Sequence, residues 1–152
     1  MKAVATADTI YADPSALLKL YILQLESVRM SAWRARIKGP LAVTHHGRVE
    51  IINGICLAAF RKYITREAMA DALASLEEDF VEGRYIQADL LWRAALKRAG
   101  DLSRKHTAEL GCRSLDVLHV ASALELERIS FLTFDHRQRK LAKAAGLKPI
   151  LI

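Results

Sequence analysis

The chain has 152 residues, 52% of them hydrophobic, so it is long enough for one compact domain and short for two. Its 23 lysines and arginines exceed the 17 aspartates and glutamates, and the net charge of +6 favours a polyanionic partner. The two cysteines fit neither a zinc pattern nor a disulfide framework, and no signal peptide or membrane-spanning apolar run occurs, so we expect a cytoplasmic protein with no membrane partner and a single domain over residues 1–152.

Short apolar runs alternate with long stretches of helical periodicity along the chain. We expect strands at residues 9–12, 41–44, 129–134 and 149–152, and helices at 14–38, 47–62, 66–82, 88–110, 114–127 and 136–145. The segment containing Tyr85 and Ile86 fits either a fifth strand or a loop. Because helices separate the strands, the pattern predicts an α/β fold with a mainly parallel sheet.

Three aspartates stand where helices are expected to begin. Asp13 and Asp135 each follow a predicted strand, and Asp116 follows Ser114, the predicted N-cap of its helix. Each aspartate alone has a structural explanation, because a carboxylate at a helix start stabilises it by about 1 kcal/mol. In an open α/β sheet, however, the strand ends that lead into helices share one edge, which is where such folds place their sites.

Glu50 is harder to explain as a structural residue. It lies inside a predicted helix with Val49 and Ile51 on either side, and a glutamate is almost never buried without a partner. Its helix follows the strand at 41–44, so we expect Glu50 to reach the same crevice as the three aspartates.

Charge repulsion limits what such a gathering of acids can mean. Two carboxylates about 5 Å apart repel each other by roughly 3 kcal/mol at an effective dielectric constant of 20. A whole domain is stabilised by only about 5 to 15 kcal/mol. The acids must therefore take up protons or hold a hard divalent cation, and a set of oxygen ligands favours Mg²⁺ or Mn²⁺ over zinc.

Four segments of the chain resemble, in order and spacing, the acidic motifs of PIN-domain ribonucleases, and among them VapC-type toxins of toxin–antitoxin pairs. The segments are "IYADPSALLKLY", "RVEIINGI", "RSLDVLHVASALEL" and "FLTFDHRQRKLAKAAGL", and together they cover nearly the whole chain. The resemblance implies a three-layer α/β/α domain with a mainly parallel central sheet. It also implies a pocket that holds one or two Mg²⁺ or Mn²⁺ ions and cleaves single-stranded or looped RNA.

The resemblance also implies roles for individual residues. Two hydroxyl residues, Ser15 and Thr133, fall where the family often has small supporting side chains. The catalytic and metal-binding carboxylates would be Asp13, Glu50, Asp116 and Asp135.

Three histidines depart from the expected pattern or lie near the motifs. His45 and His46 stand where many relatives have a strand end rich in serine or threonine. We expect this pair to be a loop feature and His119 to be a partly buried hydrogen-bonding residue, because neither arrangement has the spacing of a metal-ligand set.

These features lead to the hypothesis of metal-assisted hydrolysis of RNA, in which Glu50 or Asp135 orients or deprotonates the attacking water. A basic helix after Asp135 would guide the RNA backbone through Arg137, Arg139 and Lys140, although a solvated helix face explains each residue equally well. The resemblance further implies a homodimer and a small antitoxin protein whose tail covers the pocket. The alternative is a non-catalytic PIN-fold module that binds RNA or protein.

Overall fold

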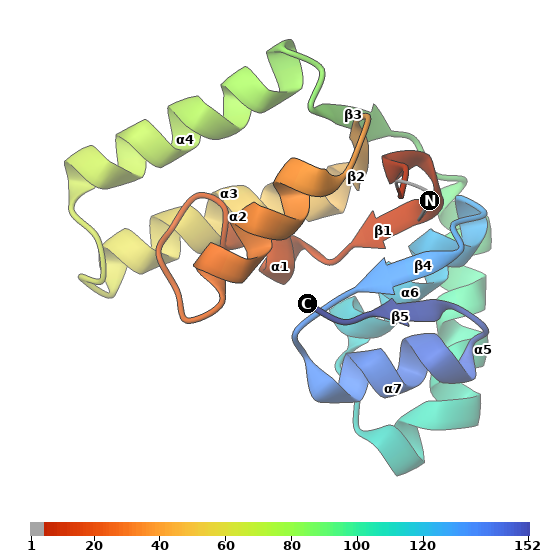
Figure 1. Ribbon diagram of the computed structural model, residues 1–152. Coiled ribbons are helices and arrows are strands. Elements are labelled where there is room, and N and C mark those ends of the chain that lie inside the picture. The colour runs from red at the N-terminus through yellow and green to blue at the C-terminus, as the bar shows by residue number, and fades with distance from the viewer. Residues whose placement is uncertain (1–4) are drawn as a thin grey trace. The chain divides into compact units, whose positions relative to one another are not determined.

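The computed structural model describes residues 5–152, which form two compact units built from non-contiguous segments. Three parallel strands define the first, here called the three-stranded unit, which contains residues 9–13 and 89–151 (Figure 1). The second, the two-stranded unit, contains residues 5–8 and 14–88 together with Ile152. That the two units make a single domain stays a prediction.

The three-stranded unit contains the strands that follow the expected α/β pattern most closely. Its sheet has the order β1–β4–β5 with every pair parallel, and Ile10 pairs with Ser130 while Ala12 pairs with Leu132. The chain therefore leaves β1 and β4 at the same edge of this sheet. The elements of the unit are β1 (Ile10–Ala12), α5 (Trp92–Leu110), α6 (Ser114–Glu125), β4 (Ser130–Leu132), α7 (His136–Ala144) and β5 (Lys148–Ile150).

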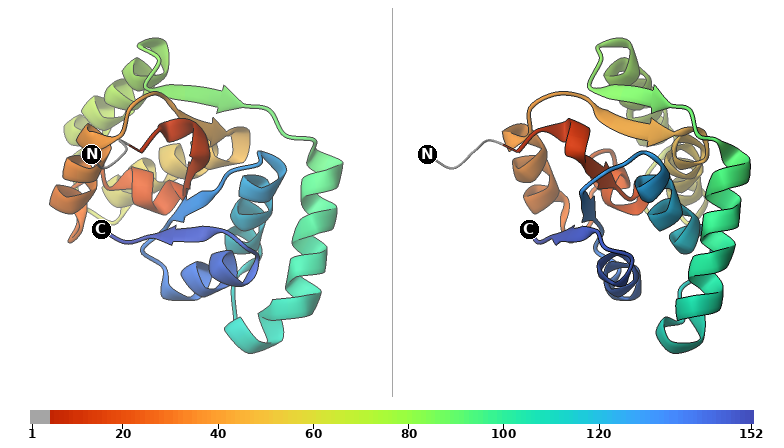
Figure 2. Two further views of the ribbon diagram at one scale, coloured as in Figure 1. Left: turned by 45° about the vertical axis from the view of Figure 1, so that its right-hand side comes forward. Right: turned by 90° about the vertical axis from the view of Figure 1, so that its right-hand side faces the viewer.

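The core of this unit lies between the sheet and its helices. The rings of Tyr11 and Phe131 stack at 5.5 Å, and apolar side chains of α6 and α7 pack around them, including Val117, Val120 and Leu141. The hydroxyl of Tyr11 is hydrogen-bonded to Nδ1 of His119, at 2.7 Å, inside this core. The predicted role of His119 as a hydrogen-bonding residue is therefore confirmed. Helix α5 packs along α6 (Figure 2).

The two-stranded unit pairs β2 with β3 in parallel, so that Leu41 lies opposite Tyr85 and Thr44 opposite Ala88. Helix α1 packs on α3 so closely that a Cβ atom on Gly54 would lie 2.8 Å from a methyl carbon of Leu18. The elements of the unit are α1 (Pro14–Leu18), α2 (Ser27–Arg36), β2 (Leu41–Thr44), α3 (His45–Phe60), α4 (Arg66–Val81) and β3 (Tyr85–Ala88), and a short 3₁₀ turn, Ala7–Thr9, precedes β1.

The predicted α/β class with parallel strands is confirmed, and the segment around Tyr85 and Ile86 is a strand rather than a loop. The helix predicted over 14–38 is wrong, because the chain forms two helices separated by residues 19–26. At this break Ser27 Oγ accepts the N–H of Gln24, at 2.8 Å, and donates to the carbonyl of Ile22, at 3.2 Å. Such side-chain bonds to nearby backbone compete with helix formation.

Two smaller predictions about helix starts are also wrong. Arg113, not Ser114, is the N-cap of α6, and Ser114 is the first helical residue. His45 and His46 form the first turn of α3 instead of a loop, because Thr44 caps this helix by accepting the N–H of Gly47 at 3.1 Å. Between residues 5 and 152 no helix is long and apolar enough to cross a membrane.

Replacing Tyr11 with phenylalanine tests the buried pair with His119. The change removes the hydroxyl and takes one partner from a buried ring nitrogen, so we expect the free energy of unfolding to fall by about 1–3 kcal/mol. Urea titration measures this difference. The matched control is Tyr63→Phe, because Tyr63 is 78% exposed. This substitution should change the free energy of unfolding by no more than about 0.5 kcal/mol. Equal stability of the two variants would contradict the proposed contribution of the pair.

Candidate active site

Two of the predicted acids follow adjacent parallel strands of the three-stranded unit. Asp13 comes directly after β1, is buried, and donates its backbone N–H to the carbonyl of Leu132 at 2.9 Å. Asp135 lies just beyond β4 and caps α7, with its Oδ1 accepting the N–H of Gln138 at 2.8 Å. The parallel pairing of β1 and β4 therefore delivers both carboxylates to one edge of the sheet, as expected.

Thr133 holds the turn between β4 and α7. Its buried hydroxyl accepts the N–H of Asp135 at 3.0 Å, and its carbonyl accepts a hydrogen bond from Arg139 at 2.9 Å. The side chain thus orients the backbone that carries Asp135. This contact is consistent with the supporting role that the family resemblance implies.

Gln138, which the sequence analysis did not single out, joins the third acid to the other two. Its Nε2 donates to Oδ1 of Asp13, at 2.8 Å, and to the backbone carbonyl of Asp116, at 3.2 Å. The sequence did contain a feature that could have drawn attention to Gln138, because Asp135 and Gln138 have the D-x-x-Q spacing of a capping box. In that motif the glutamine would turn back to the cap residue, whereas here it reaches Asp13 instead.

The electrostatics of Asp116 show that these carboxylates influence one another. Burial raises the pKa of Asp116 above its ordinary value, and the negative charge of Asp13 raises it further, with a smaller contribution from Asp135. Arg113 acts in the opposite direction through an ion pair of 3.4 Å, but its side chain is 84% exposed and the contact is therefore weak. Arg113 thus compensates the negative charge of Asp116 only weakly.

A hollow of about 320 Å³ opens beside Asp116 and Asp135. Its rim includes Arg113 and the exposed Arg137. Of the three predicted RNA-binding residues, Arg137 therefore lies at the site, Arg139 donates to a backbone carbonyl, and Lys140 is exposed on α7. Cys112 also lines the hollow, and burial together with the nearby charges of Asp116 and Asp135 raises the pKa of its thiol.

The donor chemistry of this hollow suits a hard divalent cation, since carboxylate oxygens are the ligands that Mg²⁺ and Mn²⁺ prefer. In the described part of the chain no three His, Cys, Asp or Glu side chains are already grouped closely enough to enclose one ion. Mg²⁺ does not need such a cage, because it usually keeps several waters and binds through one or two carboxylates. Asp116 and Asp135, which both line the hollow, fit that mode of binding.

Two predicted site residues lie in the two-stranded unit. Glu50 is half-buried in α3, and Ser15 is exposed in the first turn of α1. Their approach to the carboxylates of the three-stranded unit stays a prediction. In the same unit, Nε2 of His46 lies 3.4 Å from the hydroxyl of Thr44, the residue that caps α3.

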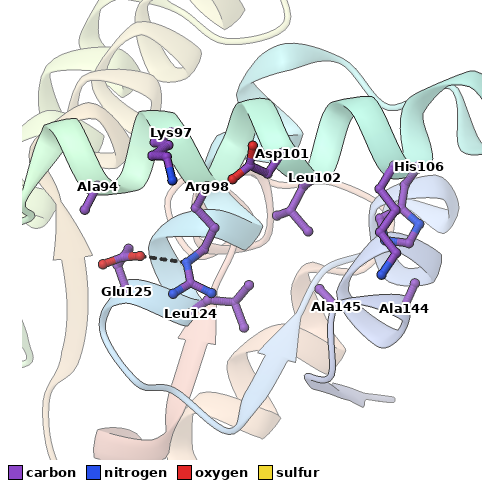
Figure 3. A pocket seen from close by; sticks show the side chains of 11 residues that line it. Ala94, Lys97, Arg98, Asp101, Leu102, His106, Leu124, Glu125, Ala144 and Ala145 are labelled. Carbon is purple, nitrogen blue, oxygen red and sulfur yellow. Dashed lines mark hydrogen bonds and ion pairs between the residues drawn. The ribbon is translucent and has the colours of Figure 1, made fainter.

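A second hollow of the three-stranded unit, about 500 Å³ in volume, contains none of the predicted acids. Figure 3 shows it between α5 and the C-terminal ends of α6 and α7, with Leu102 and Leu124 on its apolar wall. Its two acidic side chains are already engaged, Glu125 by Arg98 at 2.6 Å and Asp101 by Arg104 at 2.9 Å. Both carboxylates of this larger hollow are therefore already paired with arginine, unlike those that line the smaller hollow beside Asp116 and Asp135.

The raised pKa of Asp116 predicts how Asp116→Asn changes stability with pH. Below about pH 3.9, the pKa of an unfolded aspartate, position 116 is neutral in both proteins and their stabilities should agree. As the pH rises through this value and through the raised pKa of Asp116, the wild type loses stability, because its folded state binds the proton more tightly than its unfolded state. The variant should therefore become the more stable protein near neutral pH, by about 0.5–2 kcal/mol.

Urea titrations in EDTA at a series of pH values measure this difference. Asp71→Asn is the control, because Asp71 lies exposed on α4, and its difference from the wild type should not grow with pH. A wild type that stays more stable than Asp116→Asn at neutral pH would contradict the repulsion among the acids.

Comparison with known proteins assigns the family. The family model of the PIN domain matches residues 10–144, a span that contains all four predicted acids. No curated protein matches the chain. PIN domains are commonly nucleases, and those nucleases generally use divalent metal ions. With parallel strands, helices between them and aspartates at the strand ends, the chain belongs to the PIN domain family.

Proposed function

We propose that this protein is a Mg²⁺- or Mn²⁺-dependent endoribonuclease that hydrolyses RNA phosphodiester bonds. The observation that carries the proposal is the convergence of Asp13, Asp116 and Asp135, with Gln138 between them. Burial, and after it the charge of Asp13, raises the pKa of Asp116. Like charges gathered in a partly buried site cost stability, and functional sites are where proteins tolerate such costs.

In the proposed reaction the side chains of the hollow hold the cation and orient the water. Asp13, Asp116 and Asp135 would bind the ion, and Gln138 donates a hydrogen bond to the carboxylate of Asp13. When bound, the cation lowers the pKa of a coordinated water and polarises the phosphoryl oxygens. Either Asp135 or Glu50 would then orient or deprotonate the attacking water, leaving a 5′-phosphate and a 3′-hydroxyl.

The arginines at the rim supply contacts for the substrate. Arg113 and Arg137 both line the hollow, so a phosphate entering it meets a guanidinium before it meets the carboxylates. Such contacts depend on charge rather than on base identity, and they favour affinity for RNA over choice of sequence.

We further propose that the protein is the toxin of a type II toxin–antitoxin pair, that it forms a homodimer, and that a small antitoxin protein inhibits it. A carboxylate-lined hollow would accept a basic side chain of such an inhibitor. Exposed apolar side chains on the two-stranded unit support protein partners, among them Leu23 and Leu25 before α2 and Phe60 at the end of α3, each more than 80% exposed.

RNA cleavage tests the nuclease proposal. We expect the wild type to cut RNA with added Mg²⁺ or Mn²⁺ and to lose this activity in EDTA. Asp13→Asn, Asp116→Asn and Asp135→Asn should each lower the cleavage rate by about 100-fold or more, because each removes a charge from the centre. Asp71→Asn makes the same chemical change on the exposed surface of α4 and should cleave like the wild type.

Two results would reject this mechanism. One is cleavage that needs no divalent ion, and the other is undiminished cleavage in all three variants. RNA binding without any cleavage would favour the alternative, a non-catalytic PIN-fold module that binds RNA or protein.

Expression in a bacterial host tests the toxin proposal. We expect the wild type to arrest growth and Asp116→Asn to relieve the arrest, because the arrest depends on nuclease activity. Co-expression of a small protein encoded next to this chain should relieve it too. Normal growth on expression of a protein that is active in vitro would reject the toxin role and leave the nuclease proposal standing.

A further inference from the structure

Gln138 connects all three acidic residues of the centre, although it carries no charge itself. Its backbone N–H donates to Oδ1 of Asp135 at 2.8 Å, and its Nε2 donates to Oδ1 of Asp13 at 2.8 Å and to the carbonyl of Asp116 at 3.2 Å. The side chain is fully buried, so these bonds are not shared with bulk water. One residue of α7 therefore ties together the end of β1, the first turn of α6 and the end of β4.

The surroundings fix which way the amide faces. Its two neighbours, the carboxylate of Asp13 and the carbonyl of Asp116, are both acceptors and carry no proton to donate when Asp13 is ionised. A reversed amide would place its oxygen against two other oxygens, so the nitrogen must face them. Both N–H protons of the amide are then engaged.

The same orientation leaves the amide oxygen in an unfavourable position. Oε1 of Gln138 is buried, and no group in the described part of the chain donates a hydrogen bond to it. A buried acceptor without a donor destabilises a fold, and an apolar side chain of similar length would avoid this cost. Packing alone therefore does not explain a glutamine at position 138. A requirement for the two N–H donors of its amide, which bind Asp13 and the carbonyl of Asp116, does explain it.

A neutral donor also suits a cation site better than a charged one. A lysine or arginine in this place would cancel the charge of Asp13 and compete with a metal ion for it. The amide of Gln138 fixes the carboxylate by hydrogen bonding and leaves its negative charge in place. Asp13 is then held near Asp116 in spite of the repulsion between them.

We propose that Gln138 is a positioning residue of the nuclease centre, whose amide sets the orientation of the Asp13 carboxylate before a cation binds. This inference rests on the proposed function, because it assigns Asp13 to the metal-binding carboxylates. Gln138 acts through Asp13 and does not itself touch the RNA or the reacting atoms.

Gln138→Met tests the proposal, since methionine matches the length of glutamine and has no donor. We expect kcat for RNA cleavage to fall about 10-fold or more while KM stays within about 2-fold, because a positioning defect affects the reacting centre rather than RNA binding. The dissociation constant of Mn²⁺, measured by the electron paramagnetic resonance signal of free Mn²⁺, should rise by a similar factor. The Tm in EDTA should fall by no more than about 4 °C, because removal of the unpaired Oε1 offsets part of the loss of the two hydrogen bonds that the amide donates.

A double variant separates positioning from a general structural role. In the Asp13→Asn background, Gln138→Met should change the Mn²⁺ dissociation constant by no more than about 2-fold, because the group through which it acts is already altered. Gln87→Met is the matched control. Gln87 also donates from its amide to a backbone carbonyl, that of Val43, at 2.8 Å. Removing this hydrogen bond should lower Tm but leave kcat and Mn²⁺ binding unchanged.

The outcomes distinguish this inference from the proposed function. Wild-type cleavage with unchanged kcat and Mn²⁺ affinity in Gln138→Met would overturn the positioning role and leave the nuclease standing. A wild type that never cleaves RNA, but whose Mn²⁺ affinity falls in Gln138→Met and not further in the Asp13→Asn background, would overturn the nuclease and support the positioning role. Two other results would make Gln138 a structural residue and the inference wrong. One is that Gln138→Met and a second apolar variant, Gln138→Leu, both fail to fold. The other is that the effects of Asp13→Asn and Gln138→Met on the Mn²⁺ dissociation constant multiply in the double variant.

Discussion

The candidate site depends on the parallel pairing of β1 with β4, two strands about 120 residues apart in the chain. Their register places Ala12 opposite Leu132, so that Asp13 and Thr133 leave the sheet side by side and the Asp13 N–H reaches the carbonyl of Leu132. A slip of one residue would turn every side chain to the other face of the sheet. The stacked rings of Tyr11 and Phe131 hold the register, and the bond from Tyr11 to His119 links it to the helix that carries Asp116.

Within this frame the balance of charge decides what the site can do. A protein could relieve repulsion among buried carboxylates with a buried arginine or lysine, as ordinary ion pairs do. Here the neutral amide of Gln138 donates to Asp13, and Arg113, which pairs with Asp116 at 3.4 Å, is largely exposed. Burial raises the pKa of Asp116 and the nearby charge of Asp13 raises it further, so repulsion between the two carboxylates adds to the cost of burial in the folded protein. The fold thus keeps a negative charge in place that a divalent cation can neutralise.

The sequence was sufficient to place Asp13 and Asp135 after parallel strands and Asp116 in the first turn of a helix, while their catalytic role stays a prediction. Parallel strands deliver their ends to one edge, and helix starts favour aspartate, so strand boundaries and residue type together located these acids. Gln138 could not be found in this way, because its role depends on the direction in which a side chain of α7 points in the folded chain. The break between α1 and α2 was missed for a similar reason, since it rests on bonds between the Ser27 side chain and nearby backbone. Glu50 and Ser15 belong to the two-stranded unit, and their role at the centre stays a prediction from the family resemblance.

The net charge of the chain and the charge of its site have opposite signs, and the difference has a consequence for the proposed reaction. A chain of charge +6 attracts RNA at long range, and Arg113 and Arg137 continue this attraction to the rim of the hollow. Beyond the rim a phosphate meets Asp116 and Asp135, which repel it. The final approach of the phosphate to these carboxylates becomes favourable only when their negative charge is neutralised. In the proposed reaction the cation would therefore bring the scissile phosphate into the centre as well as activate water, and the affinity of the site for RNA would rise with its occupancy by metal.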